Sequence, residues 1–167
     1  MEEKLLPAEE QGAEKNLPLA TRSALNSISG IAGLADFDLA RLEGKKTFGT
    51  DEKLKSKKII SQLFKEGKSV SQSGFTLVYL ATALKTYYPV QAGFTVPKRF
   101  FKRAVDRNRI KRLMREVYRA NKFGLYKKLA AEKQQLAVMF VYNGRKLPEF
   151  AETDKAVTAC IKKLAKT

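Results

Sequence analysis

The sequence predicts an α+β domain in which a helix, two or three strands, a basic helix, another strand and a last helix follow one another. Three short apolar segments, 74–81, 90–96 and 135–142, have the alternation or the unbroken apolar run that is typical of strands. The segments around them repeat apolar residues every three or four positions, which is typical of amphipathic helices. A strand, a helix and a buried strand in succession indicate a parallel crossover.

The first helix is predicted to end at Gly67. Ser56 or Thr50 can cap its N-terminus, and Gly67 is expected at the position after a helix where glycine is favoured. Apolar residues spaced by four occur in two pairs, Ile59 with Leu63 and Ile60 with Phe64. We expect most of these side chains to enter the core.

The strand predicted over Val90–Val96 has one apolar face and one polar face. Gln91, Gly93 and Thr95 form the polar face, and the glycine leaves a gap at its centre. Another backbone could approach the strand there. Pro97 has no N–H to donate, so it is expected to close the strand.

The helix predicted from Ala104 onward is strongly basic. The stretch Lys98–Lys122 holds eleven Lys and Arg against two acids. Its apolar positions have helical spacing and are Ile110, Leu113, Met114 and Val117, whereas another face carries Arg107, Lys111 and Arg115. One side of this helix can pack against a core and the other can hold phosphates. Gly124 is expected to separate it from a further helical stretch, 125–132.

The charge of the chain indicates a polyanionic partner. The net charge is +16, yet residues 1–46 carry six Lys and Arg against eight Asp and Glu, so the basic character belongs to the rest. No apolar run approaches the roughly 20 residues that span a bilayer. A solvated basic face is the ordinary explanation of such a helix, but like charges spaced by four destabilise it unless an anion compensates them. Nucleic acid is therefore favoured as the partner.

The run R-A-V-D-R-N-R-I-K-R-L-M-R-E over Arg103–Glu116 resembles the RNR signature of the protein subunit of bacterial ribonuclease P. The flanking segments Ala92–Arg99 and Leu63–Ser69 resemble the strand before that signature and the end of the family's first helix. The resemblance covers residues 47 to about 165. It implies a ribonuclease P protein-like domain over 47–167, preceded by an extension over 1–46 that we expect to be disordered or partly helical.

The resemblance implies a two-layer α/β sandwich with a mixed sheet of about four strands in the order αβββαβα. The βαβ crossover through the basic helix would be left-handed, against the general rule. The family's ribonucleoprotein removes the 5′ leader from precursor tRNA. Its RNA subunit is catalytic and holds most of the Mg²⁺, and one protein per RNA binds that RNA and the precursor tRNA.

Site residues follow from the resemblance. The residues expected to bind RNA are Arg103, Arg107, Asn108, Arg109, Lys111, Arg112 and Arg115. Those expected to line the leader-binding cleft are Phe64, Thr95, Lys98, Arg99, Arg145 and Lys146. Phe64 could stack on a base or pack in the core. The family often has aromatic residues where this chain has Ile60 and Val78, so its cleft is expected to be less aromatic.

The domain is poor in catalytic groups. The chain has no histidine, and the nine acids after residue 46 are scattered. Asp106 and Glu116 lie among arginines and are expected to form salt bridges. Cys160, the single cysteine, lies on the apolar side of the last helix and is expected to be a buried, inert thiol. We therefore expect no catalytic residue and no metal site in the protein itself, and a reducing cytoplasm fits the chain.

Three other functions remain open on the residues alone. A ribosomal or chaperone-type protein would bind RNA without supporting cleavage. A DNA-binding protein would place the basic helix in a major groove. A nuclease acting without RNA would need clustered carboxylates for two metal ions.

Overall fold

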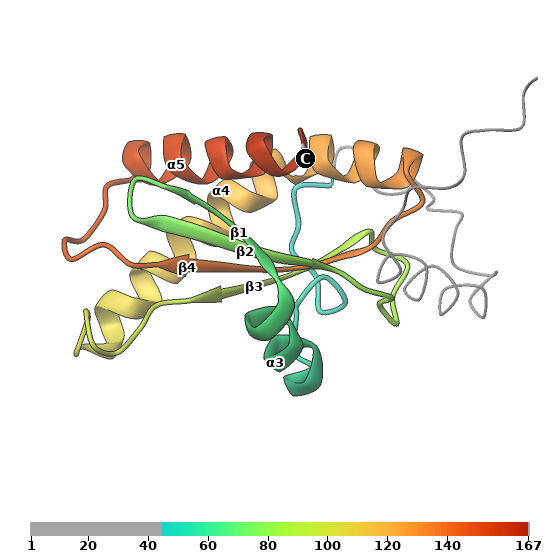
Figure 1. The fold of residues 1–167 in the computed structure, drawn as a ribbon. Helices are drawn as coiled ribbons and strands as arrows, with labels where there is room; N and C mark the ends of the chain where they lie inside the picture. The colour runs from blue at the N-terminus through green and yellow to red at the C-terminus, as the bar shows by residue number, and fades with distance from the viewer. Residues whose placement is uncertain (1–44, 167) are drawn as a thin grey trace, which may run out of the picture. The chain divides into compact units, whose positions relative to one another are not determined.

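The computed structural model describes residues 45–166 (Figure 1). The mixed sheet, the α+β class and the order αβββαβα are confirmed. The elements are α3 Lys57–Glu66, β1 Lys68–Gln72, β2 Phe75–Ala81, β3 Val90–Thr95, α4 Ala104–Ala131, β4 Leu136–Tyr142 and α5 Phe150–Leu164. The expectation of disorder or partial helix before residue 45 lies outside the described residues.

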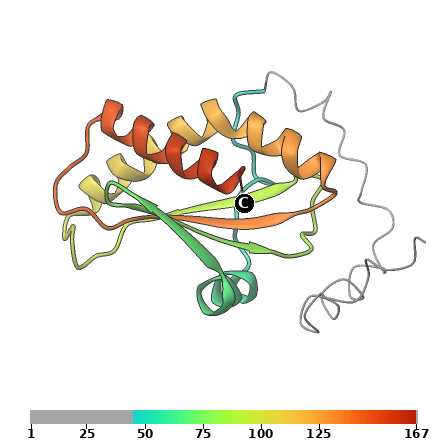
Figure 2. The same cartoon turned by 45° about the horizontal axis from the view of Figure 1, so that its top comes forward.

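The apolar strand β4 lies in the interior of a sheet with the strand order β1-β2-β4-β3. It pairs antiparallel with β2 and parallel with β3, and six of its seven residues are buried. Helices α4 and α5 lie on one face of the sheet and α3 lies on the other (Figures 1 and 2). The parallel pair β3 and β4 is joined through α4, as expected; the left-handed sense of that crossover stays a prediction.

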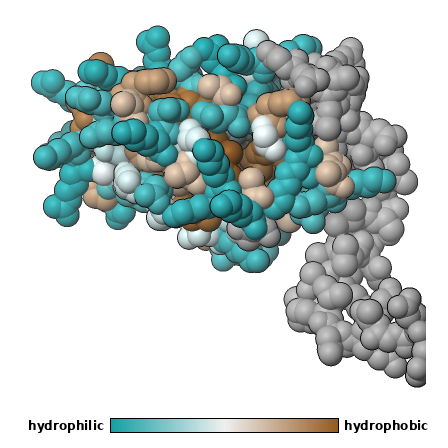
Figure 3. Space-filling model, turned by 90° about the horizontal axis from the view of Figure 1, so that it is seen from above, coloured by the Kyte–Doolittle hydropathy of each residue, from teal (hydrophilic) through white to brown (hydrophobic). Residues whose placement is uncertain are grey.

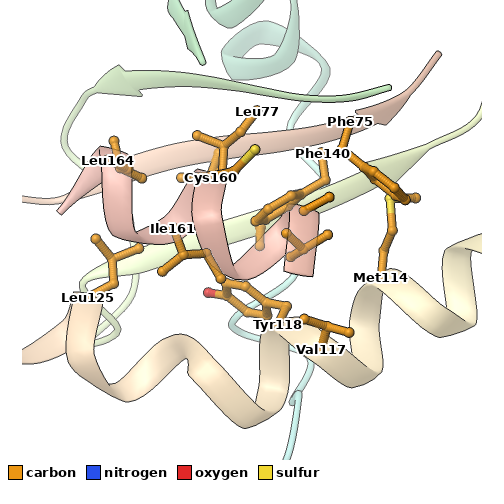
Figure 4. Packing of buried hydrophobic residues seen from close by; sticks show 14 of the residues in the cluster. Phe75, Leu77, Met114, Val117, Tyr118, Leu125, Phe140, Cys160, Ile161 and Leu164 are labelled. Carbon is orange, nitrogen blue, oxygen red and sulfur yellow. The ribbon is translucent and has the colours of Figure 1, made fainter. Parts of the chain in front are cut away.

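The main core lies between the sheet and the two long helices (Figure 4). Strand residues that point into it include Phe75, Leu77 and Phe140, and helix residues that meet them include Met114, Val117, Tyr118, Leu125, Cys160, Ile161 and Leu164. Burial confirms the expectation for Cys160. Removal from water raises the pKa of its thiol, so the reactive thiolate is disfavoured at neutral pH.

Helix α4 is one continuous helix of 28 residues, so the expected break at Gly124 is wrong. The apolar stripe continues beyond the glycine through Leu125, Tyr126 and Leu129, all of which are buried. Packing of this second half stabilises a helix that glycine alone would weaken. A Cβ at position 124 would meet no atom within 4 Å, so nothing around the site requires glycine.

Helix α3 begins and ends at predicted residues. The Oγ of Ser56 accepts a hydrogen bond from the Ile59 N–H, at 3.4 Å. Gly67 ends the helix, but its φ is −70°, so it does not adopt the left-handed conformation that usually favours glycine after a helix. A Cβ on Gly67 would lie 2.2 Å from the Leu63 carbonyl oxygen. Glycine is needed because the helix backbone approaches closely.

Strand β1 has no clear sequence signal because it is a polar edge strand. It pairs with β2 through a two-residue turn, Ser73–Gly74, in which both residues have positive φ values, 46° and 79°. Such φ values are typical of the type I′ turn that suits the twist of a hairpin. The hairpin turn therefore determines how β1 pairs with β2, although β1 has no apolar pattern of its own.

Residues 47–54, here called the N-terminal strap, run beside the free edge of β3. The Leu54 N–H donates to the Ala92 carbonyl at 3.0 Å, and the Ala92 N–H donates to the Glu52 carbonyl at 2.8 Å. Lys53 forms a parallel β-bridge with Ala92. The strap therefore adds a short pairing to the edge of the sheet.

Candidate nucleic-acid interface

The expected RNA-binding residues lie at the N-cap of α4, which is Arg103, and on the first half of the helix, away from its buried stripe. Arg103, Asn108, Arg109 and Arg112 are exposed, and Arg107, Lys111 and Arg115 are half-buried. Between residues 45 and 166, none of these residues forms an ion pair with a carboxylate. Their charges are thus left for an external anion. Figure 3 looks onto the side of the molecule that carries α4 and α5, and it shows hydrophilic side chains over much of that side.

The two acids of the basic stretch behave differently. Glu116 pairs with Arg119 one helical turn further on, as expected. Asp106 makes no ion pair with any residue that the structure describes, so that expectation is wrong. Arg119 is therefore the arginine of the basic stretch that a described carboxylate neutralises, and it is not one of the seven residues expected to bind RNA.

Arg107 has a structural contact that the sequence pattern did not indicate. Its guanidinium donates to the carbonyl oxygens of Phe101 at 2.8 Å and Lys102 at 2.7 Å. Both acceptors belong to the loop between β3 and α4. Arg107 therefore holds this loop against the start of the helix, and part of its hydrogen-bonding capacity is already used.

The loop between β3 and α4 is anchored by an aromatic residue. Phe101 is buried, with its ring 5.9 Å from that of Tyr142. Phe100 is half-buried, and the Arg99 guanidinium lies 4.6 Å from its ring centroid, a cation–π contact. Lys98 and Arg99 are themselves exposed. The anchored loop thus presents two cations on a fixed backbone.

Several expected cleft residues lie in loops at the same edge of the sheet. Lys98 and Arg99 follow β3, and Arg145 and Lys146 follow β4. Because β3 and β4 are parallel neighbours, both loops leave the sheet at the same edge, where α4 also begins (Figure 1). All four side chains are exposed.

A row of small side chains crosses the sheet at this edge, on the face that carries α3. The strand register places Ser71, Thr76, Val141 and Thr95 opposite one another, and we call these four residues the edge row. The Ser71 and Thr76 hydroxyls lie 3.0 Å apart, and the Asn143 amide donates to Thr76 at 3.2 Å. The row offers hydroxyl groups to a polar chain lying across it.

The gap expected over Gly93 is filled. A Cβ at this position would lie 2.6 Å from the Cε of Met139, which comes from the neighbouring strand. The glycine therefore makes room for a methionine side chain and leaves no opening for a second backbone. Thr95, two residues further along β3, is half-buried and remains at the accessible edge.

Phe64 lies on the surface of α3. Its side chain is 55% exposed, whereas Leu63 beside it is fully buried. Val78 and Ile60, at positions that are often aromatic in the resembled family, pack in the small core beneath α3. Phe64 is therefore not a core residue. It lies on α3, and Figure 1 shows this helix apart from the end of the sheet where the loops after β3 and β4 leave it.

Two basic-stretch residues differ from the sequence-based interpretation. Leu113 was expected in the core, but it is half-buried at the surface. Lys122 was counted among the cations of the basic stretch, but it is 4% exposed and forms a buried ion pair with Glu52 of the strap. No periodic pattern could have revealed that pair, because its partners are 70 residues apart.

The described part of the chain offers neither a metal site nor a helix that could span a membrane. Residues 45–166 contain no group of three His, Cys, Asp or Glu side chains placed to hold a metal ion. Across the same residues, no helix combines the length and the apolar character that crossing a bilayer requires.

Sequence comparisons identify related proteins. The family model described as Ribonuclease P matches residues 48–165. The ribonuclease P protein component of Chlorobaculum tepidum is 39% identical over 98 residues, which are 54% of this chain and 64% of that protein. That of Porphyromonas gingivalis is 33% identical over 122 residues, 71% of this chain and 88% of that protein. The chain thus covers slightly less than two thirds of the Chlorobaculum protein.

A solved structure shows the same fold. The RNase P protein of Staphylococcus aureus aligns with a TM-score of 0.55 at 19% identity, over 68% of this chain and 94% of that chain.

Proposed function

Because the chain belongs to the ribonuclease P protein family, we propose that it is the protein subunit of ribonuclease P, which removes the 5′ leader from precursor tRNA. The observation that carries this proposal is the basic face of α4, where six Arg and Lys and one Asn lie together without a carboxylate partner among the described residues. Such a face binds phosphates by charge-assisted hydrogen bonds.

The RNA subunit is proposed to carry out hydrolysis with Mg²⁺ that it holds itself. The protein contributes affinity. Exposed Arg103, Arg109 and Arg112 suit phosphate contacts, and exposed Asn108 suits a directional hydrogen bond because it has no charge. One protein acts with each RNA, in the cytoplasm.

The 5′ leader is proposed to bind at the edge of the sheet. The exposed cations Lys98, Arg99, Arg145 and Lys146 would follow its phosphates, and the hydroxyls of the edge row, including that of Thr95, would contact its sugars and bases. A basic groove with an exposed aromatic residue binds single strands with little sequence preference. Phe64, which is exposed on α3, would supply such an aromatic residue if the leader extends over that helix.

The test is reconstitution with a bacterial ribonuclease P RNA and a precursor tRNA at low Mg²⁺. We expect the protein to raise the cleavage rate and to bind the RNA with a steep dependence on salt. Arg112→Ala should weaken binding and lower the salt slope by about 0.9, because one phosphate contact is lost. Lys162→Ala, at an exposed position of α5, is the control for the change in net charge.

Each outcome separates the proposal from its alternatives. RNA binding without stimulated cleavage would indicate a ribosomal or chaperone-type protein. Equal competition by duplex DNA at fixed salt would indicate a DNA-binding protein, and cleavage by the protein alone would indicate a nuclease. If Arg112→Ala and Lys162→Ala behaved alike, the assignment of the α4 face would be wrong.

A further inference from the structure

A hollow of about 420 Å³ lies between the N-terminal strap and α4. Phe48 of the strap and Leu113 of the helix form apolar parts of its wall. Lys53 of the strap faces the helix residues that complete it, which are Arg112, Arg115, Glu116 and Arg119. Two segments about 60 residues apart in the sequence therefore place four cations around one cavity.

The charge of the hollow is poorly balanced. Glu116 is its only acid, and it is already paired with Arg119. Within residues 45–166, no carboxylate lies within ion-pair distance of Lys53, Arg112 or Arg115. Cations held this close repel one another, so an anion in the hollow would stabilise them.

The strap that carries Lys53 is held by a buried network next to that residue. Glu52 is fully buried and accepts hydrogen bonds from the Gly49 N–H and the Tyr126 hydroxyl, each at 2.7 Å. The Lys122 ammonium forms an ion pair with Glu52 and donates to the Thr47 carbonyl at 2.5 Å. The backbone on both sides of Phe48 is thereby tied to α4.

The ring of Phe48 supports the wall of the hollow. It makes edge contacts with Phe94 and Tyr118, with centroids 5.5 and 5.7 Å away. The Lys53 ammonium lies 5.9 Å from the Phe48 ring centroid. The cation is therefore positioned by an aromatic residue that is itself packed against the core.

We propose that this hollow binds a backbone phosphate of the RNA partner, held by Lys53 together with Arg112, Arg115 and Arg119. The inference rests on the proposed function and extends the interface from α4 to the strap. A phosphate fits because its oxygens can accept from several guanidinium groups at once while the lysine adds a point charge. The buried Glu52–Lys122 pair acts as a positioning device for Lys53.

Lys53→Ala tests the hollow, with Lys55→Ala as its matched control. Both side chains are exposed and both changes remove one charge from neighbouring positions, but only Lys53 lines the hollow. Binding of the full chain to ribonuclease P RNA alone should weaken several-fold for Lys53→Ala, with a salt slope lower by about 0.9. Lys55→Ala should change the slope much less.

Equal slopes for the two variants would overturn the inference while the proposed function stands, provided that the parent protein binds RNA and stimulates cleavage. A parent protein that does neither would overturn both.

The positioning role is tested in a second background. Glu52→Gln combined with Lys122→Met removes both buried charges, so no unpaired charge remains in the interior. If the pair positions Lys53, then Lys53→Ala should weaken RNA binding less in this background than in the parent chain. An equal loss in both backgrounds would contradict the positioning role, and the comparison with Lys55→Ala still tests the hollow by itself.

Discussion

Individual arginines of the basic helix have different roles, although their sequence contexts are similar. Arg112 is exposed and makes no ion pair in the described part of the chain, so its charge is available to a ligand. Arg107 donates two hydrogen bonds to the loop before the helix. The spacing of the two residues could not distinguish these tasks, because the loop carbonyls that Arg107 meets are placed by the packing of Phe101.

Arg107→Ala is expected to reduce stability as well as RNA binding. The variant loses two charge-assisted hydrogen bonds to backbone carbonyls, which corresponds to a cost of about 1–3 kcal/mol in the free energy of unfolding. Urea denaturation of the parent, Arg107→Ala and Arg112→Ala measures this cost. An Arg107→Ala protein as stable as Arg112→Ala would show that the loop contact contributes nothing.

Phe64→Ala should affect leader binding with little effect on stability. The side chain is 55% exposed, so little apolar contact is lost in the folded protein. If Phe64 stacks on a base, the variant should lose roughly 1–3 kcal/mol of affinity for precursor tRNA. Its affinity for tRNA without a leader should be unchanged. Equal losses for both substrates would place the contact outside the leader.

At the scale of elements, packing overrides local propensity in α4. Gly124 should favour an end or a weak point, but the buried residues Leu125, Tyr126 and Leu129 continue the same helix along the sheet and α5. The polar strand β1 is a similar case, because its pairing with β2 follows from the hairpin turn. The continuation of α4 past Gly124 and the position of β1 therefore could not be predicted from local sequence alone.

Gly124→Ala is expected to stabilise the protein. The position is exposed, is helical, and has open space where a Cβ would be added. Alanine is favoured over glycine in a helix interior by about 0.5–1 kcal/mol. Thermal or urea unfolding would show the gain, and RNA binding should not change. A loss of stability would indicate that the helix needs flexibility at this residue.

At the scale of the described domain, the N-terminal strap connects the free edge of β3 to α4, the longest helix. Glu52, Lys122 and Tyr126 form a buried hydrogen-bonded group, and the neighbouring Tyr118 and Tyr126 hydroxyls lie 3.3 Å apart. Burial raises the pKa of both tyrosines above the ordinary value, so their hydroxyls stay protonated at neutral pH. The strap, the edge of β3 and α4 are thus held together by polar groups that are shielded from water.

Glu52→Ala should be strongly destabilising. It leaves the Lys122 ammonium buried without its carboxylate, and loss of one partner of a buried pair costs about 3–5 kcal/mol. Denaturant unfolding of Glu52→Ala and of the double variant Glu52→Gln with Lys122→Met would separate the cost of an unpaired charge from the net contribution of the pair. The double variant should be the more stable of the two.

Much of the fold can be predicted from the order of residues. Alternating and continuous apolar runs locate β2, β3 and β4, and the Arg103–Glu116 run identifies the basic helix and its family. These features are local, since each depends on which residues share one face of a strand or helix. The same reasoning places the seven candidate RNA-binding residues on the first half of α4.

Contacts between distant segments were decided only by tertiary packing. The pairing of Lys122 with Glu52, the filling of the space over Gly93 by Met139 and the meeting of Lys53 with Arg112 each join residues more than 40 positions apart. No short-range repeat in the sequence indicates that these residues lie close together. It arises because the sheet, its edge strap and α4 must share one core, and the packing of that core determines which cations are buried and which stay exposed.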